Sequence, residues 1–316
     1  MSCVDAYCRR LRIDERPIEP TIETLQLLTE RHLQYIPFEN ISMHLVSEDD
    51  APVVLEREKL LHKILTQQRG GCCLELNGAY AILLQELGYR VQFISCWVYA
   101  GAERGHASKK AKFRVQQTHF VLLVQPPNDD TVKYLVDVGL GEPPCHPLPY
   151  ILNQETVTPD GMQSRIVEDP RGSWKDGSGR ERKCHILEWF KNNGWEPRLQ
   201  WDACDAVFDK DHIDVSSSLL CYQYVVPILT HPKSTFSRKL IVCLLNRNEK
   251  LSLSGWTLKR TSPRFVNSVI TTESVESQDE LKQILRDEYG MDISWLSDLT
   301  VNRSNDHHAG KIWDHL

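Results

Sequence analysis

Apolar residues recur at helical spacing through the first ninety positions of the chain. The clearest repeat stops before Gly88, a residue typical of the end of a helix. Its members are Leu76, Tyr80, Leu83, Leu84 and Leu87. A helix is also predicted over residues 21–35, because Thr21 suits the N-cap and Glu23 places an acid in the first turn. Residues 55–68 predict another helix.

After Gly88 the pattern changes to runs of β-branched and aromatic residues separated by turn-forming residues. These runs predict strands at 90–99, 119–124, 134–138 and 185–190, and a hairpin at 239–245 and 251–257. Residues 171–183 are polar and contain glycine, which indicates a surface loop. A last helix is predicted at 279–289. We therefore expect an α+β protein with a helical first third, a β-rich middle and a mixed last third.

Length and composition are those of an ordinary soluble protein. The chain has 316 residues, 41% of them hydrophobic and 25% charged, which excludes a disordered chain, a collagen-like repeat and a disulfide-stapled miniprotein. The formal net charge of −6 argues against a protein whose main task is to grip nucleic acid. A local basic patch could still hold an anionic small molecule.

The N-terminus shows no apolar stretch of signal-peptide length, and no 18 consecutive apolar residues occur anywhere. None of the ten cysteines is spaced as CxxC, and no cysteine–histidine set has zinc spacing. We therefore expect free thiols in a reducing cytosol, without a metal site and without a membrane anchor.

A candidate nucleophile follows the only pair of glycines before a predicted helix, in the segment Arg69-Gly-Gly-Cys-Cys-Leu-Glu-Leu-Asn77. Cys73 falls at the start of an amphipathic helix, where free N–H groups and the helix dipole stabilise an anion. A thiolate there has a lowered pKa. The alternative is common: a lone cysteine at a helix start is often only a small buried apolar residue.

Two strands supply candidate partners. His119 opens the strand 119–124, and Asp137 interrupts an otherwise apolar strand, where an unpaired carboxylate would be costly. The two positions are symmetric about Asn128 in the turn between them. A simple antiparallel hairpin would therefore place His119 opposite Asp137 on one face, about 5 Å apart at Cβ. The carboxylate could then hold one imidazole nitrogen and leave the other for a cysteine.

The prediction of a catalytic site depends on finding Cys73, His119 and Asp137 together, and on the register of the two strands. A strand histidine is usually only hydrogen-bonded or solvated, and a strand aspartate is usually a cap or an edge charge. A register shift of one residue would place the two side chains on opposite faces.

Several motifs together resemble the arylamine N-acetyltransferase family, and within it the fungal-type members. The segment 69–77 resembles the family's R-G-G-x-C-x-E-x-N signature, and segments 118–123 and 134–141 resemble its histidine and aspartate strands in the same order. Upstream, the run Pro-Phe-Glu-Asn-Ile at 37–41 resembles its P-F-E-N motif. Downstream, 230–236 resembles the entry into its third domain.

This resemblance implies a helical bundle over 1–90 carrying the nucleophile, a β-barrel over 91–215 carrying the histidine and aspartate, and an α/β lid over 216–316. It also implies a cysteine-protease-like triad that works as a transferase. The nucleophile would be Cys73, the base His119 and the orienting carboxylate Asp137. The activity implied is ping-pong acyl transfer from acyl-CoA to an aromatic amine, a reaction of xenobiotic detoxification.

The sequence departs from the family pattern in three places. Cys72 stands where an aromatic residue is often found, so that two adjacent thiols compete for the nucleophile's role, and the motif favours Cys73. Leu140 stands where many members carry phenylalanine. The segment between Tyr99 and His119 is longer than in the animal enzymes.

Acetyl-CoA or malonyl-CoA is expected as a co-substrate, and no permanently bound cofactor is expected. A basic cluster in the long segment is a candidate contact for the CoA phosphates, although a solvated charged loop explains it equally well; it consists of Lys109, Lys110, Lys112 and Arg114. The resemblance adds Gly139 and Thr230 as CoA contacts. It assigns the amine pocket to Phe38, Val98, Tyr99 and Leu140. The preference for acetyl or malonyl, the physiological amine and the oligomeric state stay open.

Two other functions share the motifs. One is a cysteine amidase or transglutaminase-like hydrolase, which would use the same residues without CoA. The other is an inactive relative that only binds amines or CoA. The glycines at 139 and 141 also begin like a dinucleotide-binding loop, but Pro144 replaces the third glycine and no amphipathic helix follows.

Overall fold

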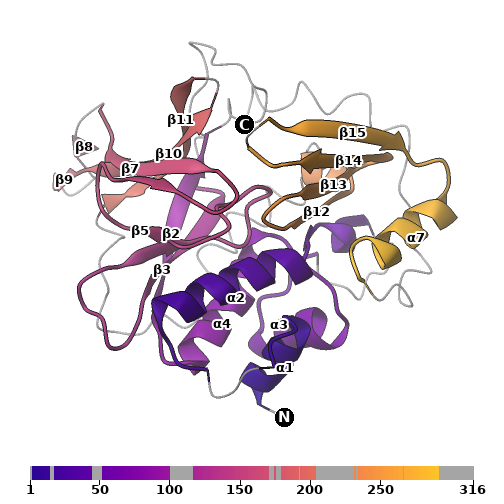
Figure 1. Cartoon of the computed structure of the whole chain (residues 1–316), viewed down its shortest axis with the longest axis horizontal. Helices are drawn as coiled ribbons and strands as arrows, with labels where there is room; N and C mark the ends of the chain where they lie inside the picture. Colours follow the sequence, from indigo (N-terminus) through magenta and orange to yellow (C-terminus); the bar gives the residue numbers. More distant parts are fainter. Residues whose placement is uncertain are drawn as a thin grey trace.

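A computed structural model describes residues 2–14, 18–44, 52–99, 117–170, 174–175, 179–191, 193–203, 231–232, 234–265 and 267–291. Figure 1 shows helices α1 to α4 at the bottom, an eight-stranded sheet at upper left and a five-stranded sheet at upper right, with α7 on the outer side. The predicted α+β class is confirmed. Within the described residues, no helix has both the length and the apolar character needed to cross a bilayer.

The N-terminal helices are α1 (Cys3–Arg10), α2 (Ile22–Tyr35), α3 (Arg57–Leu61) and α4 (Cys73–Glu86), with a 3₁₀ turn at Ile41–His44 and a π-helical turn at His62–Thr66. Helices α2 and α4 begin and end close to the predicted positions, the helix predicted at 55–68 is α3 followed by a π-helical turn, and α1 was not predicted. Thr21 is the N-cap of α2, and its hydroxyl accepts the N–H of Thr24 at 3.2 Å. Gly88 follows α4 with φ of +95°, a conformation that favours glycine.

Helix α4 lies at the centre of the molecule rather than on its surface. Every residue from 73 to 84 is buried, so the predicted amphipathic character is wrong. The reason is that α4 packs against α1 and α3 on one side and against β2 and β3 of the large sheet on the other. A helix covered on all sides can place a polar residue on any face, provided that the residue finds a partner.

The eight-stranded sheet forms a nearly closed barrel in the order β5-β4-β3-β2-β11-β10-β7-β6. Its strands are β2 (Arg90–Val98), β3 (His119–Gln125), β4 (Tyr134–Val136), β5 (Leu148–Pro149), β6 (Glu155–Val157), β7 (Gln163–Glu168), β10 (Cys184–Lys191) and β11 (Gly194–Asp202). Beyond β5, a parallel bridge from Leu152 to Ile166 of β7 links the two ends of the sheet. Apolar side chains of these strands fill the interior.

The predicted surface loop at 171–183 contains a short ladder, so its assignment as irregular is partly wrong. Strands β8 (Trp174–Lys175) and β9 (Glu181–Arg182) pair antiparallel there.

The five-stranded sheet joins segments from the two ends of the chain. Its strands are β1 (Phe38–Glu39), β12 (Ile241–Leu245), β13 (Lys250–Ser254), β14 (Thr257–Ser262) and β15 (Val269–Ser274), with the helices α6 (Thr235–Arg238) and α7 (Gln278–Asp287) beside it. The predicted hairpin is β12–β13. Asn40 fastens β1 here: its amide donates to the carbonyls of Phe236 and Lys239 at 2.7 and 2.8 Å, and its oxygen accepts the N–H of Ile241 at 2.7 Å.

The hairpin of β3 and β4 has a different register from the predicted one. Leu122 pairs with Val136 and Val124 with Tyr134, so the hairpin is centred on Asp129 and not on Asn128. Because the offset between the two registers is two residues, His119 and Asp137 still share a face, as diagonal rather than opposed neighbours. The strand also ends at Val136, two residues earlier than predicted.

Candidate active site

The two glycines before Cys73 are required by close packing. A Cβ on Gly70 would lie 1.8 Å from the carbonyl oxygen of Pro37, and one on Gly71 would lie 2.7 Å from Cβ of Glu75. Only glycine lets the chain pass here between β1 and the first turn of α4. The helix then begins at Cys73, as predicted, with Cys72 as its N-cap.

His119 and Asp137 form a short contact: His119 Nε2 lies 2.7 Å from Asp137 Oδ2, and both side chains are buried. The second oxygen, Asp137 Oδ1, accepts the N–H groups of Gly139 at 2.8 Å and Leu140 at 3.2 Å. It also accepts an amide N–H of Asn77 at 3.1 Å. The carboxylate is thus fixed by four donors, which explains how a charged group is tolerated beyond the end of an apolar strand.

Cys73 completes the site electrostatically, because the imidazole of His119 helps to lower the pKa of its thiol. A hydrogen bond from the thiol of Cys72 and the positive charge of His119 outweigh burial and lower the pKa of Cys73 to about 5. Burial opposes the charged imidazole, but the carboxylate of Asp137 prevails and raises the pKa of His119 to about 10. Between these values the pair is a thiolate beside an imidazolium.

Asn77 was missed in the sequence. It lies one turn after Cys73 on the same face of α4, and its amide also donates to the carbonyl of Phe120 at 2.7 Å while its oxygen accepts the N–H of Val138 at 3.0 Å. One side chain thus ties the helix of the cysteine to the strands of the histidine and the aspartate. The i to i+4 spacing from Cys73 was the signal that could have identified it.

A buried charge cluster supports the segment before Cys73. Glu75 accepts the N–H of Cys72 at 2.9 Å and pairs with Lys63 at 2.7 Å. Lys63 also lies 3.9 Å from Glu39, which pairs with Arg69 at 3.3 Å. The cluster thus contains two cations and two anions. It gives a structural role to Glu39 in the 37–41 motif and to Arg69 and Glu75 in the 69–77 motif.

The structure describes the four predicted amine contacts but not most of the predicted CoA contacts. Phe38 packs with the cluster that contains Cys73, and Leu140 packs against the barrel core directly beyond Asp137. Val98 packs against the barrel core and Tyr99 donates its N–H to the carbonyl of Arg198 at 2.9 Å, both at the end of β2. Five residues predicted to contact CoA lie outside the described residues: Lys109, Lys110, Lys112, Arg114 and Thr230.

Comparison with known proteins gives a consistent result. A profile of the N-acetyltransferase family matches residues 21–298. The arylamine N-acetyltransferase of Mycolicibacterium smegmatis is 37% identical over 256 residues, which cover 80% of this chain and 80% of that protein. The chain belongs to the arylamine N-acetyltransferase family. The resemblance predicted from the motifs is therefore confirmed at the level of the family.

Solved structures agree with this assignment. The arylamine N-acetyltransferase of Salmonella typhimurium superposes with a TM-score of 0.70 at 26% identity, covering 92% of each chain. The Mycobacterium marinum enzyme, solved in complex with CoA, superposes with a TM-score of 0.69 at 23% identity over 96% of each chain. Membership in this family of acetyltransferases does not favour the hydrolase alternative.

Proposed function

We propose that this arylamine N-acetyltransferase transfers an acyl group from acyl-CoA to an aromatic amine through an acyl-Cys73 intermediate. The observation that carries the proposal is the hydrogen-bonded pair His119–Asp137, together with Cys73 at the start of α4, whose pKa is lowered in part by His119. Family membership supports the reaction class, and the CoA complex of the Mycobacterium marinum enzyme supports the donor.

In the first half-reaction the thiolate of Cys73 attacks the thioester carbonyl. The new C–S bond forms, the bond to the CoA sulfur breaks, and His119 gives its proton to the departing CoA thiolate. One thioester replaces another, so the step is close to even in energy. N–H groups of the first turn of α4 are suited to stabilise the oxyanion that develops on the carbonyl.

In the second half-reaction the unprotonated amine attacks the acyl-Cys73 carbonyl. His119 accepts the amine proton, the C–S bond breaks and the Cys73 thiolate is restored. Acylation prepares His119 for this role, because the thiolate charge that helps to raise the pKa of the imidazole is absent from the acyl-enzyme. Asp137 keeps the ring oriented throughout.

Intact-protein mass spectrometry tests the intermediate. Incubation with acetyl-CoA without amine should add one acetyl mass, and peptide mapping should place it on Cys73. The adduct should disappear in Cys73→Ala and persist in Cys72→Ala. A reverse assignment would make Cys72 the nucleophile, and an unmodified wild-type protein would refute the acyl-enzyme.

Steady-state kinetics test the order of the two half-reactions. Initial rates measured against acyl-CoA at several fixed amine concentrations should give parallel double-reciprocal lines, because CoA leaves before the amine reacts. Intersecting lines would require both substrates to be bound together and would exclude the ping-pong sequence.

For the substrates we propose Phe38, Val98, Tyr99 and Leu140 as amine contacts. Two of these, Phe38 and Leu140, are supported by their packing beside Cys73 and beyond Asp137. Leu140 in place of an aromatic residue would widen the pocket. Turnover of a series of anilines and aminophenols by Leu140→Phe should favour the smaller amines if this residue lines the pocket, and an unchanged ranking would exclude it.

We propose acetyl-CoA as the donor, with malonyl-CoA as the alternative, and the basic cluster at 109–114 with Gly139 and Thr230 as CoA contacts. Parallel measurement of kcat/KM with the two donors decides between them. Neutralising the four basic residues together should raise KM for either donor and leave kcat unchanged, whereas an unchanged KM would remove them from the site. We place the enzyme in the cytosol, where it would detoxify foreign arylamines.

A further inference from the structure

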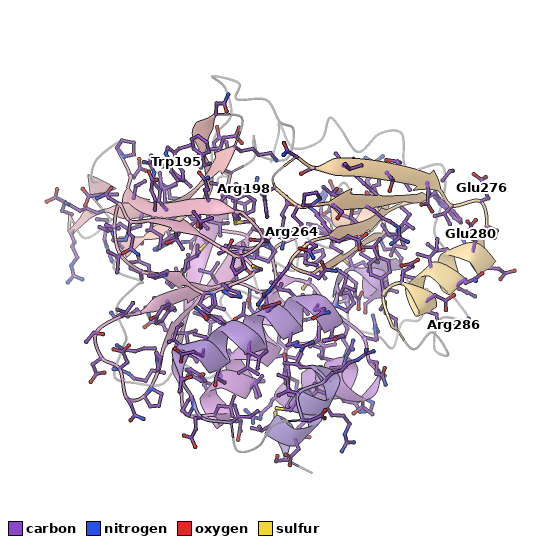
Figure 2. The ribbon with its side chains drawn as sticks, viewed as in Figure 1. Trp195, Arg198, Arg264, Glu276, Glu280 and Arg286 are labelled. Carbon is purple, nitrogen blue, oxygen red and sulfur yellow. The ribbon has the colours of Figure 1, made fainter. Side chains whose placement is uncertain are left out.

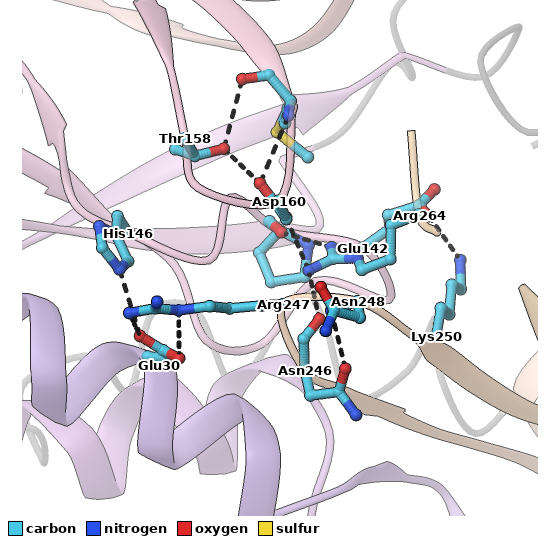
Figure 3. A network of polar contacts seen from close by, with 12 residues as sticks. Glu30, Glu142, His146, Thr158, Asp160, Asn246, Arg247, Asn248, Lys250 and Arg264 are labelled. Atoms are coloured by element: carbon cyan, nitrogen blue, oxygen red, sulfur yellow. Dashed lines mark hydrogen bonds and ion pairs between the residues drawn. The ribbon is translucent and has the colours of Figure 1, made fainter. Parts of the chain in front are cut away.

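The segment that follows Asp137 is held in place by other parts of the molecule. Residues 142–146 are contacted from the five-stranded sheet and from α2 (Figure 3). These contacts are Lys250 with Glu142 at 3.4 Å, Arg264 with the carbonyl of Pro143 at 3.1 Å, and Glu30 with His146 at 3.3 Å. Arg247, at the end of β12, pairs in turn with Glu30 at 2.6 Å. The segment is thus clamped between the sheet and α2.

Arg264 is the most deeply buried member of this clamp. Its side chain and that of its partner Asp160 have no exposed surface, and the two groups lie 2.8 Å apart. The guanidinium also donates to the carbonyls of Pro143 and, at 3.4 Å, Asn246. Figure 2 places Arg264 between the barrel and the five-stranded sheet.

The hairpin tip that carries Arg264 is anchored in the barrel. It connects β14 to β15, and its next residue, Phe265, packs against the barrel core with its ring edge-on to Trp189 at 6.3 Å. A charge in such a place is costly unless every partner stays fixed. Arg264 and Phe265 therefore fasten this connection to the barrel through Asp160 and Trp189.

The clamped segment forms one wall of a small cavity behind Asp137. The wall consists of Pro144 and His146, and Asp137 is another of the residues that line the cavity. The remaining lining is apolar barrel core: Val121, Leu135, Leu148, Leu187 and Leu199. Its volume of about 10 Å³ has room for about one water molecule.

We propose that Arg264 is a positioning residue for Asp137. By holding Pro143 it fixes the segment that follows Asp137, so that the carboxylate stays hydrogen-bonded to His119 and to the N–H groups of residues 139 and 140. The five-stranded sheet thereby contributes to the site without touching the reactants. The proposal rests on the proposed role of the triad.

The decisive variant is Arg264→Lys, because it keeps the charge and loses the planar fork that reaches Asp160 and Pro143 together. The rate of alkylation of Cys73 by iodoacetamide is measured against pH, a readout that needs no acyl donor. The midpoint of this profile should move upward, because a displaced Asp137 stabilises the imidazolium less. We expect kcat to fall by about tenfold to a hundredfold, with KM for the acyl donor nearly unchanged.

A control lies on the same hairpin. Arg260 pairs with Glu288 at 2.6 Å near the surface, and Arg260→Lys should leave the alkylation profile and kcat unaltered. If Arg264→Lys melts cooperatively and matches this control in both measurements, Arg264 is structural only and the proposal is wrong.

A second variant covers the case in which Arg264→Lys does not fold. Arg264→Gln combined with Asp160→Asn leaves no unpaired buried charge and should show the same upward shift, whereas a wild-type profile would overturn the proposal. A failure of the proposed function would appear separately, as a wild-type enzyme that acetyl-CoA does not acylate.

Discussion

Gly139 lies directly against the first residue of α4. A Cβ placed on Gly139 would come within 2.7 Å of Cα of Cys73 and 2.8 Å of the amide nitrogen of Asn77. Its own N–H is at the same time a donor to Asp137. The absence of a side chain at this position therefore sets how closely the helix of the cysteine approaches the segment of the aspartate.

Gly139→Ala should separate these two elements. The added methyl group meets backbone atoms that cannot rotate away, so the contact between Cys73 and His119 should lengthen. We expect kcat/KM to fall by about tenfold to a hundredfold, measured with acetyl-CoA and an aniline. Gly141→Ala is the matched control, because a Cβ there meets nothing within 4 Å. Equal activities of the two variants would contradict this account of Gly139.

The pH dependence of Cys73 follows from its surroundings. Because its pKa is lowered to about 5, alkylation by iodoacetamide should be at its plateau at pH 7 and should fall about tenfold per unit below pH 5. Above the pKa of His119, about 10, the imidazolium is lost and acylation by acyl-CoA should slow. A midpoint near 9, the ordinary pKa of the thiol, would mean that the ion pair does not form.

Cys72 contributes the largest lowering of the Cys73 pKa, through a hydrogen bond from its thiol. Cys72→Ala removes this donor and should move the alkylation midpoint upward while largely sparing acyl transfer at pH 8. Cys72→Ser keeps a donor and should lie between the two. An unchanged midpoint in Cys72→Ala would show that its thiol does not stabilise the thiolate.

The sequence was sufficient to predict the local features of the site. Thr21, Cys73 and Gly88 were correctly placed at helix ends because capping depends on the residue and its immediate neighbours. His119 and Asp137 were correctly paired, although from a register that was two residues off. The two side chains still share a face because side chains alternate with a period of two, and the error arose because the turn is centred on Asp129, one residue after the predicted centre.

Contacts between residues far apart in the chain could not be predicted from the local sequence pattern. Strand β1 has two residues and pairs with β12, about 200 positions later, so no periodicity could reveal it. Lys63 lies in the predicted helix 55–68, but nothing in the local pattern indicates that it is buried between Glu75 and Glu39. Arg264 lies about 100 positions from Asp160 in the sequence, and only the tertiary fold brings the two together.

Asn77 connects α4 to both strands of the triad, so a change of its charge should disturb Asp137. Asn77→Asp has the same shape but places a second buried carboxylate 3.1 Å from Asp137 Oδ1, and like charges at that distance raise the pKa of one of them. We expect kcat/KM to acquire a new titration near neutral pH. Asn77→Ala, which loses the bonds but adds no charge, should be less active at every pH without the new titration. Parallel profiles of the two variants would contradict the electrostatic explanation.

The buried cluster beneath Cys73 should stabilise the fold rather than take part in the chemistry. Lys63→Met leaves Glu75 without the cation that lies 2.7 Å away, and an unpaired buried carboxylate costs about 3–5 kcal/mol. Chemical denaturation should show a loss of this size, whereas Lys59→Met, at an exposed pair, should show little change. Adding Glu75→Gln to Lys63→Met should recover part of the loss, since the unpaired charge is removed with it. A double variant whose loss equals the sum of the two single changes would mean that Glu75 matters through its hydrogen bond to the N–H of Cys72 and not through its pairing with Lys63.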